Sequence, residues 1–592
     1  MNAKSANDSG SFFRRAIFAA LLISIFILHT VFSFDGLTSR TGIDQAQVAR
    51  EVARGNGLTT QFVRPVALQQ LVENEKEINL QQIPETYHSP LNILVYAGVL
   101  KMVGADNFEN HKMEVNDKIY KLDRIIAITC ATFFLTAIGI NYLLISRVFD
   151  AKIASTVALI MIFSEYMWKI TQAGLPQMLM LTLFSAAAYL AWRAVEAQEA
   201  ERKPLVPALL SGFFFGLLAL SHWMTLWIFI GYFIFACFYF RPRGVIAVGL
   251  AAIMLLFIAG PVIFNWTQTG EAKGTAFHAI HGAGGAADSA MRQVDSPDFN
   301  VKGLLARTAQ STLLQISNVH NYLGGLILAP AFFLCLAHPF KRSSIAIFRW
   351  NILIMWIFAS IGMGIYGLTE SQLEPNQLHL LFAPLMCGYG VALISIIWSR
   401  CPLSQQSGAL GNLHIAIILL ITAAPLLLHI KQLSENRRAL TSIDGVHAYS
   451  LNGLLNKVTD PEDIIVSDQP WAVAWYADRH AIWIPQSYGD FTKIEAIAEK
   501  SSPIAGIHIS SMSYRGDDIR TSLYRNRDMA ALAYLPWITY FTRNEAAANI
   551  SQNPSVAPLI DPQIGRYPHR ASLSGLFEPS AYYSRTKIRV KN

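Results

Sequence analysis

Long apolar runs alternate with polar stretches over the first 430 residues of the chain. A run of about 20 predominantly apolar residues can cross the hydrocarbon core of a bilayer as a helix. Eleven runs have about this length: 15–34, 124–145, 152–170, 176–193, 205–222, 223–240, 243–265, 320–338, 349–368, 379–398 and 411–430. The run 90–104 is shorter and fits a helix that lies in the membrane interface. The pattern therefore predicts a polytopic α-helical membrane protein with about eleven transmembrane helices.

The basic residues that flank these runs predict an orientation. They occur at alternate ends of the runs, in six groups: Arg14 and Arg15; Arg147 and Lys152; Arg193, Arg202 and Lys203; Arg241 and Arg243; Lys341, Arg342 and Arg349; and Arg400. Because Lys and Arg gather on the cytoplasmic side of membrane proteins, the N-terminus is expected in the cytoplasm. The segments 35–123, 266–319 and 431–592 are then expected on the external face.

The last of these segments has a different pattern from the rest of the chain. IIVSD (464–468), AIWIP (481–485) and IAGIHISS (504–511) are typical of short strands, and a helical pattern lies near 490–500. Strands that alternate with helices predict an α/β arrangement. We therefore expect two parts: a transmembrane domain over 1–430, including the loops 35–123 and 266–319, and an external α/β domain over 431–592.

Composition agrees with the membrane class. The chain of 592 residues is 53% hydrophobic and only 15% charged, with a mean hydropathy of +0.33. The net charge of +7 is not concentrated in Lys/Arg runs, so no nucleic-acid partner is expected. The five cysteines form no CxxC pair, which argues against a disulfide framework and a cysteine-ligated metal. No cofactor is predicted; a divalent metal is compatible with the chemistry considered below, but no residue pattern indicates one.

The segment TGIDQAQVAREVARGNGLTTQFVRP (41–65) follows the first predicted span and carries the densest set of polar groups near the membrane. Asp44 opens a helical pattern, so it is either a helix-capping acid or a functional carboxylate. Arg50 and Arg54, at i and i+4, share one face of that helix, which is either solvated, in contact with lipid headgroups, or bound to a phosphate. Arg64 precedes Pro65 and is expected to be extended, with its side chain free to reach a ligand.

This segment, with His88-Ser89-Pro90-Leu91 after it, resembles the first external loop of GT-C fold glycosyltransferases that use lipid-linked sugars. These include the protein O-mannosyltransferases (glycosyltransferase family 39) and the aminoarabinose transferases. Looser similarities continue through LDRIIAI (122–128), PVIFNWTQTGEAKG (261–274), QLHLLFAPLMCGYG (377–390) and VSDQPWAVAWYADRHAIWIP (466–485). The resemblance implies transfer of a sugar from a polyprenyl-phosphate donor to a glycan, lipid or protein acceptor. The reaction would occur on the external face of a bacterial inner membrane, in contact with the lipid bilayer.

By this resemblance Asp44 would be the catalytic base. Arg64, His88, Arg50, Arg54, His222 and Gln177 would contact the substrate. His88 stands where relatives have a lysine, and His222 lies at the external junction of the fifth and sixth predicted spans, where a polar residue is also a common interface anchor.

The chain departs from the family pattern in ways that leave a second interpretation open. The Asp-Glu pair of the family is Asp44-Gln45 here, and Gln177 stands in the short loop where a second acid is expected. The late-span arginine is replaced by Gln377 or His379. Glu165 could approximate the missing acid, but its spacing from Lys169 favours an i, i+4 ion pair. The alternative function is therefore a GT-C-like protein that binds a lipid-linked sugar in envelope polysaccharide assembly with weak or no transfer.

Overall fold

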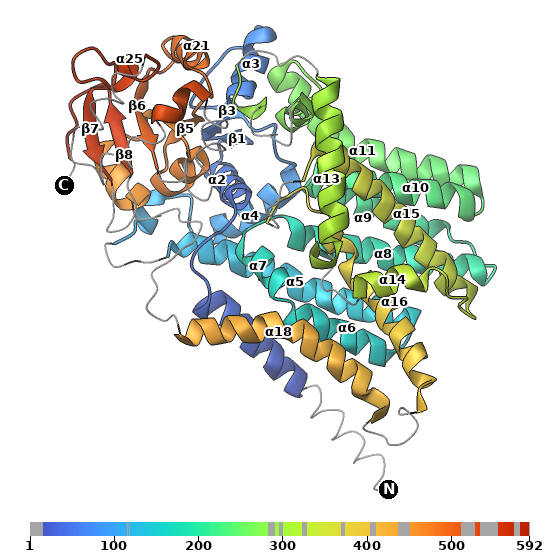
Figure 1. The fold of residues 1–592 in the computed structure, drawn as a ribbon. Coiled ribbons are helices and arrows are strands. Elements are labelled where there is room, and N and C mark those ends of the chain that lie inside the picture. Colours follow the sequence, from blue (N-terminus) through green and yellow to red (C-terminus); the bar gives the residue numbers. More distant parts are fainter. Residues whose placement is uncertain are drawn as a thin grey trace.

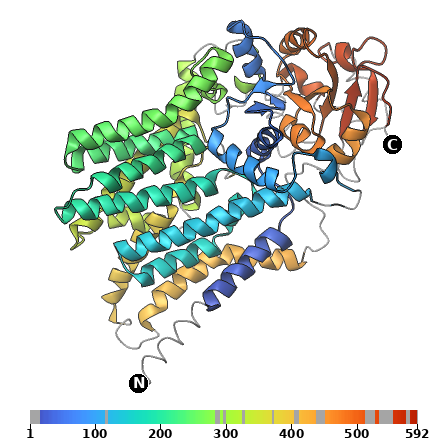
Figure 2. The ribbon, with the colours of Figure 1, turned by 180° about the vertical axis from the view of Figure 1, so that it is seen from behind.

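The computed structural model describes residues 16–114, 117, 119–281, 290–294, 300–322, 328–368, 373–402, 410–435, 450–510, 527–532, 554–573 and 580–590. A bundle of long helices forms most of the molecule, and a β-sheet unit lies at one end of it, beside the segment that follows the first helix (Figure 1). The view from behind shows the same arrangement (Figure 2). The site described below lies where these two parts meet.

Six helical segments in the described part of the chain are long and apolar enough to cross a membrane. They are α5 (Lys121–Val148), α8 (Gln177–Glu199), α11 (Arg243–Thr269), α15 (Ser343–Tyr366), α16 (His379–Ser399) and Leu410–Lys431, which includes most of α18 (Leu413–Glu435). A seventh span is formed if α6 (Ala151–Phe163) and α7 (Glu165–Gln172), bent by 54° at Ser164, are counted together. The protein is thus a multi-pass helical membrane protein.

Three other predicted spans form shorter apolar helices: Ala16–Phe32, α9 (Leu205–Ser221) and Trp223–Tyr239, whose α-helical part is α10 (Leu226–Tyr239). The number eleven stays a prediction. The run 90–104 forms a short helix, α4 (Pro90–Met102), as its length suggested.

The predicted span 320–338 begins at the end of one helix and contains a second. The helix expected at 320–338 is preceded by α13 (Val301–Tyr322), which lies largely within the predicted external loop 266–319, and α14 (Leu328–Cys335) follows. Arg307, Ser311 and Gln315 interrupt the apolar pattern of α13, yet all three are buried against the protein. The predicted apolar run therefore starts only at residue 320, after the buried polar residues of α13.

The sheet unit is a six-stranded mixed sheet. Its order is β2 (Phe62–Val63), β5 (His480–Trp483), β4 (Ile464–Ser467), β6 (Ile504–Ile509), β8 (Ala581–Ser584) and β7 (His569–Ser572). The first four strands are parallel and the last two pairings are antiparallel. The strands β4, β5 and β6 and the helix α21 (Tyr488–Ala498) form where the sequence predicted them. The strands β2, β7 and β8 were not predicted, and β2 comes from the segment 35–123. The boundary near residue 430 stays a prediction, and the sheet extends across it.

Candidate active site

The site is built on α2 (Arg40–Arg54), which starts against the turn between α7 and α8. A Cβ atom at Gly42 would lie 2.0 Å from the carbonyl oxygen of Ala173, so only glycine allows this approach. The first turn of α2 is thereby fixed beside Gly174 and the start of α8. Ser39 precedes the helix without a side-chain capping bond, and Asp44 lies one turn inside it. The capping interpretation of Asp44 is therefore wrong.

The carboxylate of Asp44 is instead bound by three side chains from separate segments. Arg64 forms a short ion pair with Oδ2. His88 donates from Nε2 to the same oxygen over 2.7 Å, and Gln47 donates from Nε2 to Oδ1 over 2.9 Å. The Asp44, Arg64 and His88 side chains are only 3%, 6% and 5% exposed. The structure thus brings together the three residues that the sequence placed first among the candidates.

The local backbone and two aromatic rings hold the partners of Asp44. Arg64 is extended, as predicted, because Pro65 begins α3 (Pro65–Glu73) directly after it. Its Cζ lies 4.2 Å from the ring centroid of Phe62 and 3.7 Å from that of Tyr87. Such cation–π contacts fix a guanidinium in place.

His88 is held from both its backbone and its ring. The Glu85 carboxylate accepts hydrogen bonds from the backbone N–H groups of Tyr87 and His88, at 2.6 and 2.8 Å. Gln45 approaches Nδ1 of His88 at 3.4 Å and accepts a bond from Asn92 at 2.5 Å. Because the structure orients both nitrogens of the ring, His88 presents Nε2 to Asp44.

Electrostatics keep Asp44 ionised. Burial alone would raise the pKa of its carboxyl group, but the Arg64 guanidinium, His88 and the Gln47 hydrogen bond outweigh burial and hold the pKa at about 2. Burial would likewise lower the pKa of Arg64, but Asp44 beside it raises that pKa above its ordinary value. A carboxylate with so low a pKa is a poor proton acceptor while these partners stay in place.

Gln47 links this cluster to the sheet unit. Its Oε1 accepts a hydrogen bond from the backbone N–H of Gln61 at 3.0 Å, and its Nε2 also reaches Thr60 Oγ1 at 2.8 Å. The side chain of Gln61 donates in turn to Asp478, at 3.0 Å. A continuous path of polar contacts therefore runs from Asp44 through Gln47 and Gln61 to the sheet unit. The i, i+3 spacing of Asp44 and Gln47 was the signal for this contact, and sequence reasoning missed it.

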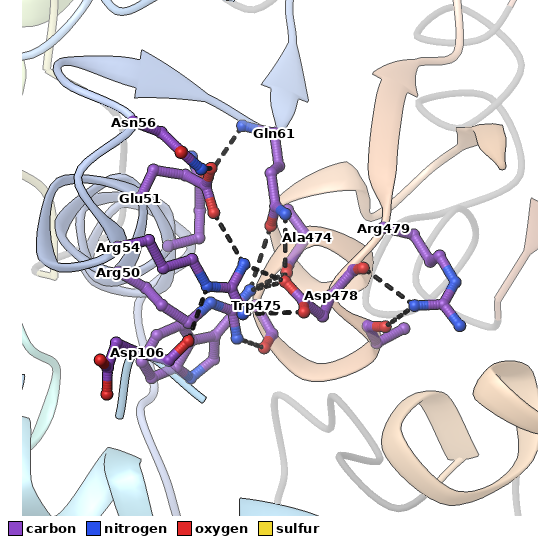
Figure 3. Close-up of polar contacts among 12 residues, drawn as sticks. Arg50, Glu51, Arg54, Asn56, Gln61, Asp106, Ala474, Trp475, Asp478 and Arg479 are labelled. Carbon is purple, nitrogen blue, oxygen red and sulfur yellow. Dashed lines mark hydrogen bonds and ion pairs between the residues drawn. The ribbon is translucent and has the colours of Figure 1, made fainter. Parts of the chain in front are cut away.

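Arg50 and Arg54 attach α2 to the sheet unit (Figure 3). Arg50 is fully buried and donates to the carbonyl oxygens of Trp475 and Ala474, at 2.8 and 2.6 Å. Both arginines pair with Asp478, Arg50 at 3.0 Å and Arg54 at 2.8 Å. Burial would raise the pKa of Asp478, but these arginines hold it well below the ordinary range. The expected solvated face is thus wrong for Arg50, whose guanidinium is used within the fold.

His222 lies close to the cluster. It follows α9, and its Nδ1 accepts a hydrogen bond from the Met224 N–H at 3.2 Å. Its ring is near enough to His88 for the two imidazoles to interact electrostatically.

Gln177 stands at the start of α8, on the far side of the turn that Gly42 contacts. It donates from Nε2 to the backbone oxygen of Glu374 at 2.6 Å, and in the described part of the chain its buried Oε1 has no hydrogen-bond partner. The two residues that could replace the late-span arginine of the family pattern also have hydrogen-bond partners. Gln377 donates to the hydroxyl of Tyr166, and His379 accepts from the indole N–H of Trp356. Glu165 pairs with Lys169 at 3.0 Å, as its spacing predicted. Among the described residues no three His, Cys, Asp or Glu side chains are grouped as metal ligands.

No family model matches this sequence, and no curated protein matches it. Solved structures do match. The oligosaccharyltransferase of Archaeoglobus fulgidus tethered to an acceptor peptide is similar with a TM-score of 0.50 at 12% identity, over 88% of this chain and 72% of that one. Its apo form gives 0.50 at 13% identity over 88% and 72%. ArnT from Cupriavidus metallidurans bound to undecaprenyl phosphate gives 0.47 at 12% identity over 84% and 94%.

The two matches with a TM-score of 0.50 establish the fold. The chain has the GT-C fold of membrane glycosyltransferases, as the resemblance in its segment 41–91 implied. At such low identity the match does not extend to the substrate or to the roles of individual residues.

Proposed function

We propose that this protein is a membrane glycosyltransferase that moves a sugar from a polyprenyl-phosphate donor to an acceptor on the external face of a bacterial inner membrane. The acceptor is a hydroxyl or amine of a glycan, lipid or protein. The N-terminus is cytoplasmic and the sheet unit external. The observation that carries the proposal is the buried Asp44 carboxylate, held between Arg64 and His88 in a chain with the GT-C fold.

The reaction assigns a task to each of these groups. The acceptor atom attacks the anomeric carbon, the bond from this carbon to the phosphate oxygen breaks, and the polyprenyl phosphate leaves with the electron pair. The acceptor loses its proton to a base, for which Asp44 is placed. Arg64 and His88 donate to the phosphate and stabilise the charge that develops on it.

The low pKa of the Asp44 carboxyl group applies to the protein without a bound donor. A donor phosphate competes with Asp44 for Arg64 and His88, the two groups that lower its pKa most. Once these groups turn to the phosphate, burial becomes the dominant influence, and burial raises the pKa of a carboxyl group. Donor binding thus converts Asp44 from a paired anion into an effective base at the moment when a base is needed.

The remaining candidates take supporting positions in this scheme. His222 contributes a further polar group for the donor phosphate, since its ring interacts electrostatically with His88. Gln177 presents a side-chain oxygen, which has no hydrogen-bond partner among the described residues, at the start of α8. Arg50 and Arg54 hold α2 against the sheet unit and so fix the direction from which Asp44 faces the substrate.

A second candidate function is supported by two of the same observations. Asp44 is fully paired, and Gln177 stands where an acid is expected. A GT-C fold protein of this kind would bind the lipid-linked sugar in envelope polysaccharide assembly without transferring it.

Turnover separates the two functions. Purified protein in liposomes is incubated with undecaprenyl-phosphate-linked hexoses and pentoses, each carrying a labelled sugar, and with total membrane extract as the acceptor source. The enzyme proposal predicts that label leaves one of these donors, and that Asp106→Asn, an exposed acid of the same loop, behaves as wild type. Arg64→Gln is expected to weaken donor binding roughly tenfold or more, the worth of a charge-assisted bond. Donor binding with no release of label would support the second function.

A further inference from the structure

Helix α13 buries a polar face and exposes an apolar one, which is the reverse of a helix that faces water. Gly303, Arg307, Ser311 and Gln315 lie four residues apart and are buried in one stripe. On the other side, Leu305, Leu313 and Ile316 are 64%, 67% and 68% exposed. A helix on the surface of a water-soluble protein buries its apolar stripe and exposes its polar one.

The polar stripe is fixed against α15, which is itself long and apolar enough to cross the membrane. Arg307 donates to the carbonyl oxygen of Ile365 at 3.1 Å, Ser311 to that of Met363 at 3.0 Å, and Gln315 to that of Ser360 at 3.2 Å. These three bonds satisfy carbonyl groups near the end of α15. They also prevent α13 from rotating its apolar face inward, so the exposure of that face is a property of the fold.

The exposed side of α13 is chemically suited to hydrocarbon. From Thr308 to Tyr322 it carries no Asp, Glu, Lys or Arg. The hydroxyls of Thr308, Thr312 and Ser317 donate to carbonyl oxygens within the helix, at 2.8, 2.7 and 3.2 Å. Internal bonding of this kind makes hydroxyl groups tolerable in lipid. The exposed amides Gln310 and Asn321 are costly groups to bring into hydrocarbon.

The apolar face of α13 also continues a surface that a membrane span already presents. Ile357 and Ile361 of α15 are 42% and 43% exposed, and Ile361 is adjacent to Ser360, which binds Gln315. Figure 1 shows α13 beside one end of α15 and inclined to it. Acyl chains that contact the exposed face of α15 would therefore also contact α13.

We propose that α13 is inserted in the outer leaflet, with Leu305, Leu313 and Ile316 in contact with lipid acyl chains. The segment 266–319 is then only partly an external aqueous loop. The chain descends into the membrane along α15 before the predicted span begins. This inference concerns the lipid surface of the protein and is independent of any transferase activity.

Cysteine accessibility tests the proposal on the full-length protein in liposomes. Leu313→Cys and Ile316→Cys are treated with a membrane-impermeant maleimide, with Glu77→Cys on the exposed first loop as the matched control and the native cysteines as background. We expect labelling about tenfold or more slower than at the control, because the thiol stays protonated and the polar reagent is excluded from hydrocarbon. All three positions should react equally after unfolding in SDS. Labelling of the α13 cysteines at the control rate would overturn the proposal.

A nitroxide on the same cysteines distinguishes lipid from a protein neighbour. Contact with acyl chains predicts frequent collisions with oxygen and few with a water-soluble nickel chelate. The reverse preference would show that the face is in water, and few collisions with either reagent would show that protein covers it. Both of these results contradict the proposal.

Discussion

Breaking the ion pair between Arg64 and Asp44 tests whether the site is held together as described. The pKa of the Asp44 carboxyl group is held at about 2, against an ordinary value of 3.8, and this difference corresponds to about 2 kcal/mol of stability at neutral pH. Asp44→Asn or Arg64→Gln alone leaves one charge buried without its counterion, which costs about 3–5 kcal/mol. The double variant removes both charges, so we expect its loss of stability to be smaller than the sum of the two single losses by about 2 kcal/mol.

The assay is the free energy of unfolding in mixed detergent micelles for wild type, both single variants and the double variant. The pH dependence provides an independent check with a defined sign. Because the folded pKa of Asp44 is depressed, its contribution is complete above about pH 4 and is lost as the pH falls towards 2. The difference in stability between wild type and Asp44→Asn should therefore shrink over this range. Additive losses within about 0.5 kcal/mol, with no change at low pH, would refute the reasoning.

Three further variants test how α2 is positioned. Gln47→Leu removes a donor to Asp44 and should lower the transfer rate about tenfold, since small misplacements of a reacting group are costly; an unchanged rate would show that the link to the sheet unit is not needed. Asp478→Asn leaves the buried Arg50 without its carboxylate partner. It should lower the free energy of unfolding by about 2–4 kcal/mol and speed tryptic cleavage of the sheet unit. Wild-type stability and a wild-type cleavage rate would contradict the role of this contact. Gly42→Ala places a Cβ 2.0 Å from a carbonyl oxygen and should lower the melting temperature by several degrees. A melting temperature equal to that of wild type would show that α2 does not depend on this close approach.

The sequence singled out three residues that the structure brings together, because they are close in the chain. Asp44, Arg64 and His88 lie within the segment 35–123, and the proline after Arg64 fixes the direction of its backbone. The pairing of Asp44 with Arg64 and His88 could not be predicted, because a hydrophobic pattern does not show which charges neutralise each other.

Contacts between distant segments account for most of what was missed. Arg50 and Arg54 were interpreted as a solvated face, as contacts to lipid headgroups or as ligands for a phosphate, because their partner, Asp478, lies more than 400 residues away in the chain. The strand β2 has only two residues and no recognisable pattern, yet it forms the edge of the sheet. The helix α13 was missed because its polar side faces the protein, which is the reverse of what a water-based pattern assumes.

Sugar transfer under single-turnover conditions tests the central claim most directly. Wild type and Asp44→Asn are each saturated with the undecaprenyl-phosphate-linked sugar that wild type uses, and the label that reaches the acceptor is followed in time. The account predicts that Asp44→Asn still binds the donor but transfers its sugar about 100-fold or more slowly, the range expected for loss of a general base. Transfer by Asp44→Asn at the wild-type rate would contradict the account.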